Sequence, residues 1–167
     1  DRVVTEFFAS GGIGLNVTAP FKGEAFALAE VHTEDAVDAK AVNTLWRDNE
    51  GRVCGHTTDG SGLALDLEVN LGWRLAGANI LFLGAGGAMR SILGPLCDRA
   101  PASIHVANRT PERAKDLVAL FRSRGSLTAG SLTAIPDREW SVVINGLSSG
   151  WAGDFPDLNI PTISCSA

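Results

Sequence analysis

The sequence has no long apolar run, few cysteines and no excess of basic residues. Its longest apolar stretch, "NILFLGAGGAM", is interrupted by glycines and is much shorter than the roughly 20 residues that a membrane-spanning helix needs, so we expect no membrane segment. The three cysteines lie far apart, without a Cys-x-x-Cys pair or a histidine at metal-ligand spacing. We therefore expect no metal site, and reduced thiols of the kind found in cytoplasmic proteins.

The charge balance is acidic. Lys and Arg number 14 against 19 Asp and Glu, which gives a formal net charge of −5. Surfaces that bind nucleic acid usually concentrate Lys and Arg on one face, so this composition argues against a nucleic-acid partner. Because 45% of the residues are hydrophobic, the 167-residue chain can build an ordinary core. Small-molecule chemistry is the class of function that remains.

The first part of the chain predicts a mixed set of short elements. Apolar spacing indicates a helix over 1–9, a strand over 13–18 and a helix after Lys22, and Thr33 is a candidate cap for another short helix. The pattern then predicts a hairpin with strands over residues 42–48 and 52–57. A longer helix is predicted over residues 60–71, and Gly72 closes it.

The second part alternates strands with helices. Strands are predicted at 79–84, 103–108, 141–146 and 161–165, and helices follow the first two of them. Connections of this length are typical of βαβ units, which build a parallel sheet with right-handed crossovers. The fold class predicted for the chain is therefore α/β.

A glycine-rich turn joins the first strand of this second part to its helix. The run "LFLGAGGAMR" approximates the G-x-G-x-x-G/A fingerprint, although Met89 stands where a small residue is usual. In such a turn one glycine permits the bend, and the next lets backbone N–H groups approach a pyrophosphate at the helix N-terminus. The candidate cofactor-binding residues here are Gly84, Ala85, Gly86, Gly87 and Ala88.

The end of the next strand indicates which dinucleotide is bound. Enzymes that use NAD usually place an acid there for the ribose hydroxyl, whereas this chain has "ANRTPER". A guanidinium group can pair with a 2′-phosphate, which a carboxylate would repel. Asn108, Arg109, Thr110 and Arg113 therefore favour NADP. Thr110 is also a candidate helix cap, with Pro111 at the first helical position.

Polar residues upstream form a candidate catalytic group. Lys22, Asn43 and Asp59 each lie at the end of a predicted strand or the start of a helix, and a lysine beside a carboxylate can transfer a proton at a carbonyl or alcohol. Spacing alone leaves ordinary roles open, namely a solvated lysine, a turn amide and a helix cap. His56 is a rival general acid, although a lone histidine on a strand is usually structural.

The motifs "NVTAPFK", "AVNT", "TDG", "GAGGA", "NRT" and "VINGLSSG", in this order, resemble the shikimate dehydrogenase family. The resemblance implies a partial α/β substrate domain over 1–59 and a Rossmann-like NADP-binding domain over 60–167. It further implies NADPH-dependent, reversible reduction of 3-dehydroshikimate to shikimate in aromatic amino acid biosynthesis. Carried over to this sequence, Lys22 is the catalytic lysine with Asp59 as its partner, and Thr18 and Asn43 contact substrate hydroxyls.

Some family features differ or are missing. Thr57 stands where the family usually has asparagine, and Gly146 and Leu147 replace the alanine and threonine that commonly follow Asn145, near the nicotinamide. The family's first strand and its later tyrosine and glutamine have no counterpart, and the chain has no tyrosine. We therefore expect a chain truncated at both ends, with NADP affinity but weak or absent turnover. Alternatives are an NAD-preferring quinate/shikimate dehydrogenase and a non-catalytic NADP-binding fragment, and a homodimer is a candidate assembly.

Overall fold

The computed structural model describes residues 2–147, and the predicted strand at 161–165 lies outside them. The first half contains four helices and four strands, in the order α1 (Arg2–Ala9), β1 (Gly14–Asn16), α2 (Lys22–Leu28), β2 (Val31–His32), α3 (Glu34–Ala39), β3 (Thr44–Arg47), β4 (Val53–His56) and α4 (Asp59–Leu65). A π-helical turn, η1 (Asp66–Asn70), continues α4. The second half contains β5 (Asn79–Leu83), α5 (Gly87–Cys97), β6 (Ser103–Asn108), α6 (Pro111–Leu120), β7 (Leu127–Ser131) and β8 (Val142–Asn145).

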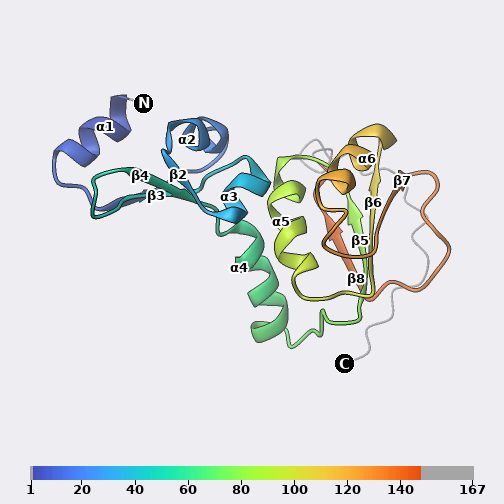
Figure 1. Cartoon of the computed structure of the whole chain (residues 1–167). Helices are drawn as coiled ribbons and strands as arrows, with labels where there is room; N and C mark the ends of the chain where they lie inside the picture. The colour runs from blue at the N-terminus through green and yellow to red at the C-terminus, as the bar shows by residue number, and fades with distance from the viewer. Residues whose placement is uncertain (1, 148–167) are drawn as a thin grey trace.

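The first half forms a small mixed sheet at the N-terminal end of the molecule (Figure 1). Its strands lie in the order β1-β3-β4-β2, with β1 and β4 antiparallel to β3 and β2 parallel to β4. The predicted hairpin is confirmed, since Gly51 has φ +82° in the turn between β3 and β4. Thr33 caps α3 as expected, because its hydroxyl accepts a hydrogen bond from Ala36 N.

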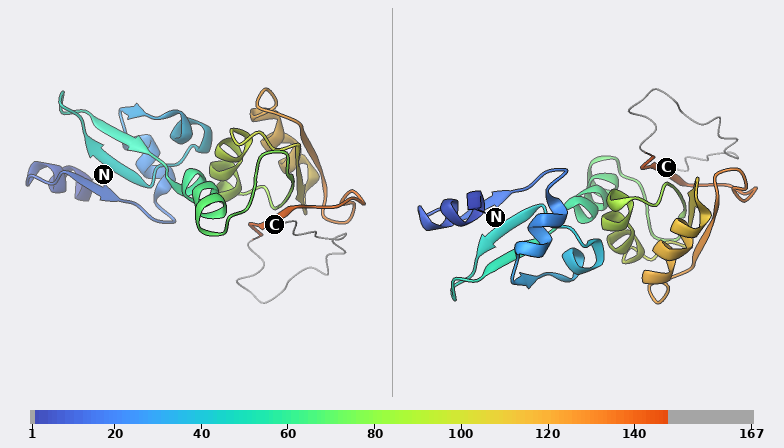
Figure 2. Two further views of the ribbon diagram at one scale, coloured as in Figure 1. Left: turned by 90° about the horizontal axis from the view of Figure 1, so that it is seen from below. Right: turned by 90° about the horizontal axis from the view of Figure 1, so that it is seen from above.

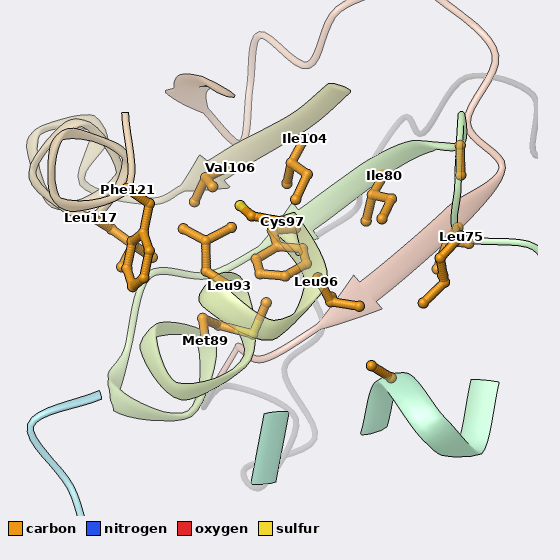
Figure 3. Close-up of a cluster of buried hydrophobic side chains, with 14 of the residues drawn as sticks. Leu75, Ile80, Met89, Leu93, Leu96, Cys97, Ile104, Val106, Leu117 and Phe121 are labelled. Atoms are coloured by element: carbon orange, nitrogen blue, oxygen red, sulfur yellow. The ribbon is translucent and has the colours of Figure 1, made fainter. Parts of the chain in front are cut away.

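Residues 79–147 of the second half form a four-stranded parallel sheet in the order β7-β6-β5-β8. The α/β fold class is thus confirmed. Alternate residues of β5 and β6 point to opposite faces, so Phe82 and Val106 pack under the helices while Leu81 and Ala107 pack on the other face against Trp140. Figure 3 shows the helix-covered core, with Met89 and Leu93 of α5 among its side chains.

The helix α4 joins the two halves. Asp59, the first residue of α4, follows β4 of the first half. Ala64 of α4 and Leu67 of η1 belong to the core of the second half. Figure 2 shows the two halves side by side along an elongated molecule, with α4 and α5 between them. Among the described residues, no helix combines the length and apolarity needed to cross a bilayer.

Three sequence predictions about secondary structure need correction. The first sheet contains β2 and the second contains β7, neither of which was predicted, and the predicted single helix over 60–71 changes to π-helical geometry from Asp66. Thr110 occupies the N-cap position of α6, but its side chain makes no capping hydrogen bond. The amide of Asn108 instead donates to Thr110 O, at 2.9 Å, and fixes this turn from outside the helix.

Candidate functional site

An ion pair lies where the first sheet meets α4. Lys22 begins α2 and Asp59 begins α4, and Lys22 Nζ is 2.7 Å from Asp59 Oδ2. The two side chains keep 30% and 33% of their surface exposed, so the pair is open to a small ligand. Asp59 is the first residue of α4 rather than its cap, because Thr58 holds the cap position. Its carboxylate is therefore free to pair with residues from other elements.

Asn43 holds the second oxygen of this carboxylate. The hairpin pairs Thr44 with His56, so the residues just beyond that pair, Asn43 and the 57–59 segment, meet at the open end of the hairpin. The amide Nδ2 of Asn43 donates to Asp59 Oδ1 at 2.9 Å and to Thr58 Oγ1 at 3.0 Å. Asp59 is thus held by a lysine on one oxygen and an amide on the other.

The amide of Asn43 has no unused hydrogen-bonding capacity. Its Oδ1 accepts from Thr44 Oγ1 at 2.9 Å and from the backbone N–H of Thr58 at 3.1 Å, which matches the two donors of Nδ2 described above. The four bonds fix which end of the amide faces Asp59. Thr44 and Thr58 were not predicted as site residues; the only signal in the sequence is that each adjoins a residue that was.

Two other predicted residues lie outside this network. Thr18 is exposed in the loop before α2, and within residues 2–147 its hydroxyl makes no hydrogen bond to Lys22 or Asp59. His56 points to another neighbour, since its Nδ1 is 2.8 Å from Thr33 Oγ1. His56 therefore makes a structural contact with Thr33 and does not join the group around Asp59.

The glycine loop lies at the carboxyl end of β5, beside those of β6 and β8. Gly84 has φ +109°, which favours glycine, and its N–H donates to Ala107 O at 2.8 Å. A Cβ added at Gly86 or Gly87 would meet no atom within 4 Å, and both residues and Ala88 are exposed. Open backbone N–H groups at the start of α5 are the arrangement that binds a pyrophosphate.

The predicted phosphate-binding arginines follow β6 at the same edge. Arg109 and Arg113 are exposed, and no acidic partner of either is found in the described part of the chain. Asn108 and Thr110 lie beside them in the turn. Two unpaired guanidinium groups can accept a phosphate without breaking an existing ion pair.

Close packing of α4 on α5 connects the two groups of residues. A Cβ at Gly60, directly after Asp59, would be 3.0 Å from Ile92 Cα and 2.8 Å from Pro95 Cγ, and nearer still to Ser91 O. Only glycine permits this approach. Gly60, which is next to Asp59 of the ion pair, therefore packs directly against α5, the helix that begins at the glycine loop.

Comparisons with protein families agree with this arrangement. The shikimate dehydrogenase substrate binding domain matches residues 1–45, and the shikimate/quinate 5-dehydrogenase family matches residues 67–149. A shikimate dehydrogenase (NADP(+)) of Thioalkalivibrio sulfidiphilus is 47% identical over 155 residues, which are 93% of this chain and 57% of that protein. The chain thus spans little more than half the length of that curated relative.

Two solved structures resemble the chain in three dimensions. An Ael1 enzyme from Pseudomonas putida has a TM-score of 0.88 and 37% identity, with 95% of this chain and 58% of that one covered. A shikimate 5-dehydrogenase of Listeria monocytogenes, solved with shikimate and NAD, has a TM-score of 0.78 and 25% identity, with 89% and 54% covered.

Proposed function

Because this chain belongs to the shikimate dehydrogenase family, we propose that it carries the acid–base pair and the cofactor loop for NADPH-dependent, reversible reduction of 3-dehydroshikimate to shikimate. The observation that supports this most directly is the contact of Lys22 with Asp59, 2.7 Å, on the same chain as a dinucleotide-type glycine loop. We retain the division into a substrate domain (1–59) and a cofactor domain (60–167) as part of the proposal.

The residues at the sheet edge fit NADP. Gly86 and Gly87 leave open space over the N-terminus of α5, and Arg109 and Arg113 are exposed and not committed to acids in the described residues. We assign the pyrophosphate to residues 84–88 and the 2′-phosphate to Asn108, Arg109, Thr110 and Arg113. When bound, the reduced nicotinamide supplies the hydride to the carbonyl carbon.

Lys22 is the proposed proton donor. Its ammonium, held by Asp59, protonates the oxygen of the substrate carbonyl as that carbon is reduced, and the neutral amine removes the proton in the reverse direction. Asp59 keeps the lysine oriented through the 2.7 Å contact. Asn43 fixes the carboxylate by binding its other oxygen, 2.9 Å away.

Substrate hydroxyls are assigned to Thr18 and Asn43. Since all four hydrogen-bonding positions of the Asn43 amide are occupied, a substrate hydroxyl can bind it only by replacing a partner. The hydroxyl of exposed Thr58 is the partner most easily displaced, because it can turn to water. Thr18 is free to bind directly.

The catalytic assignment predicts a specific loss in Lys22→Ala. Removing a general acid typically costs about 10²–10⁴ in turnover, and NADP⁺ affinity should not change. Shikimate oxidation followed by NADPH absorbance, with NADP⁺ binding measured separately, tests this; Lys115→Ala, which removes an exposed lysine of α6, is the control. Equal rates for Lys22→Ala and the unaltered chain would contradict the assignment.

The cofactor assignment predicts a loss of NADP⁺ affinity in Arg109→Ala. Charge-assisted pairing with a phosphate is worth about 1.5–3 kcal/mol, or more than tenfold in Kd, whereas NAD⁺ lacks that phosphate and should bind both proteins equally. Calorimetric titration with both nucleotides measures the difference. If the unaltered chain binds NAD⁺ as tightly as NADP⁺, the NAD-preferring quinate/shikimate alternative gains support.

A non-catalytic NADP-binding role is the second candidate, and the observation that favours it is that the Asn43 amide has all four of its hydrogen-bonding positions occupied by groups of the protein. That role predicts that the unaltered chain and Lys22→Ala both bind NADP⁺ and that neither oxidises shikimate. We also propose a cytoplasmic location, from the biosynthetic role of the family, and a homodimer as the assembly to be tested by sedimentation.

A further inference from the structure

The strand order of the second sheet contains a switch point, at which the side of the sheet where successive strands are added changes. From β5 the sheet grows through β6 to β7 on one side, and β8 is added on the other side of β5. In open parallel sheets, dinucleotides cross the carboxyl edge at such a switch point. The two sides of this switch point are the glycine loop after β5 and residues 146–147 after β8.

These two loops are in direct contact. A Cβ at Gly84 would be 3.0 Å from the carbonyl carbon and oxygen of Gly146, and the N–H of Gly146 donates to Leu83 O at 2.8 Å. The backbone of one loop therefore rests on the backbone of the other. A shift of residue 146 would be transmitted to the glycine loop.

Met89 occupies the space beside Gly146 that a side chain would need. It lies in the first turn of α5, directly after the glycine loop, and is 1% exposed. A Cβ at Gly146 would be 2.7 Å from Met89 Cγ and closer to its Sδ. The φ of Gly146 is outside the left-handed region, so the obstacle to a larger residue is Met89 and not backbone strain.

We propose that Met89 and Gly146 form a complementary pair that sets the separation of the two loops, and that Met89 is thereby a positioning residue for the cofactor; this rests on the proposed function. Met89 departs from the small residue of the G-x-G-x-x-G/A fingerprint. Gly146, which has no side chain, leaves the space that the Met89 side chain fills. An unbranched thioether adapts readily to such a gap.

A double-mutant cycle tests the pair. Gly146→Ala alone should lower the Tm by about 5 °C, because the new methyl group collides with Met89, and should weaken NADP⁺ binding about tenfold. Met89→Ala alone leaves a cavity and also lowers the Tm. In the Met89→Ala background, however, Gly146→Ala should be neutral or stabilising, because its methyl group enters that cavity. Met89→Val replaces Met89→Ala if the latter does not fold.

Gly62→Ala is the control for adding a methyl group, since a Cβ there meets no atom within 4 Å, and we expect no loss of Tm or affinity. If Gly146→Ala causes the same loss in both backgrounds, the two residues act independently and the inference is wrong. If the effects of the two substitutions on Tm are coupled but no variant binds NADP⁺, the packing of Met89 on Gly146 is correct. The proposed function, and with it the positioning role of Met89, is then wrong. NADP⁺ binding with additive effects would overturn only the inference.

The sequence offers an independent probe, because Met89 is its single methionine. Labelling with [methyl-¹³C]methionine gives one signal from the body of the chain, apart from any initiator methionine. Addition of NADP⁺ should shift that signal in the unaltered protein, and Gly146→Ala should shift it without cofactor. A signal that NADP⁺ leaves unchanged, while calorimetry records binding, would contradict the positioning role.

Discussion

His105 is a buried titratable residue away from the proposed catalytic group. It lies on β6, its Nδ1 is 2.8 Å from Thr128 Oγ1, and its ring centroid is 6.0 Å from that of Trp140. Burial, and secondly the positive charge of Arg138, lower the pKa of His105 below its ordinary value. The folded state therefore disfavours the imidazolium form.

This lowered pKa makes stability depend on pH. As pH falls below about 6.5, the unfolded chain binds a proton at His105 before the folded chain does, so the free energy of unfolding falls between that pH and the folded pKa. The slope from one proton is at most about 1.4 kcal/mol per pH unit. Urea unfolding from pH 7.5 to 5 should give a shallower dependence for His105→Gln. Parallel curves for the two proteins would contradict the prediction.

At the scale of elements, β7 illustrates what local pattern misses. Its residues, "LTAGS", include glycine, which is a poor strand former, and the apolar alternation is limited to Leu127 and Ala129, too short to mark a strand in the sequence. The strand exists because β6 offers a free edge, to which Leu127 through Ser131 pair in parallel register. Tertiary pairing here overrides weak local preference.

The contact of α4 with α5 gives a second prediction at this scale. In Gly60→Ala the new Cβ would overlap the backbone of α5 at Ser91 and Ile92, which cannot move like a flexible side chain. We expect a loss of about 1–3 kcal/mol in the free energy of unfolding, measured in urea. Gly62→Ala, on the same helix but in open space, should cause no loss. Equal stability of both variants would show that α4 can shift freely on α5.

At the scale of the whole molecule, arginines of the second half hold α3 of the first. Arg124, after α6, lies 2.5 Å from Glu34 Oε1 and 2.7 Å from Asp38 Oδ2, and Arg90 Nε donates to Asp38 O. Burial raises the pKa of Asp38, and the guanidinium of Arg124 opposes that rise. These contacts brace the two sheets against each other.

The brace predicts that Arg124→Ala destabilises the protein more than loss of an exposed ion pair does. The side chains of Arg124 and Asp38 are only 22% and 25% exposed, so removing one charge leaves the other poorly solvated, at a cost of about 1–3 kcal/mol. Arg52→Ala removes a side chain that is 49% exposed and pairs with Asp48 and Glu50 of the same hairpin, so it should cost at most about 1 kcal/mol. Thermal unfolding of both variants measures the contrast, and equal Tm values would argue against the brace.

The sequence by itself determined the α/β class, the glycine turn, the hairpin and most helices, because periodicity and turn chemistry are local properties of the chain. It also pointed to Lys22, Asn43 and Asp59, but could not place them together. Tertiary structure decided the Lys22–Asp59 contact, the saturation of the Asn43 amide and the packing of Met89 on Gly146. Those contacts join residues that are distant in the chain. Such residues come into contact only when the strands pair and α4 packs closely against α5.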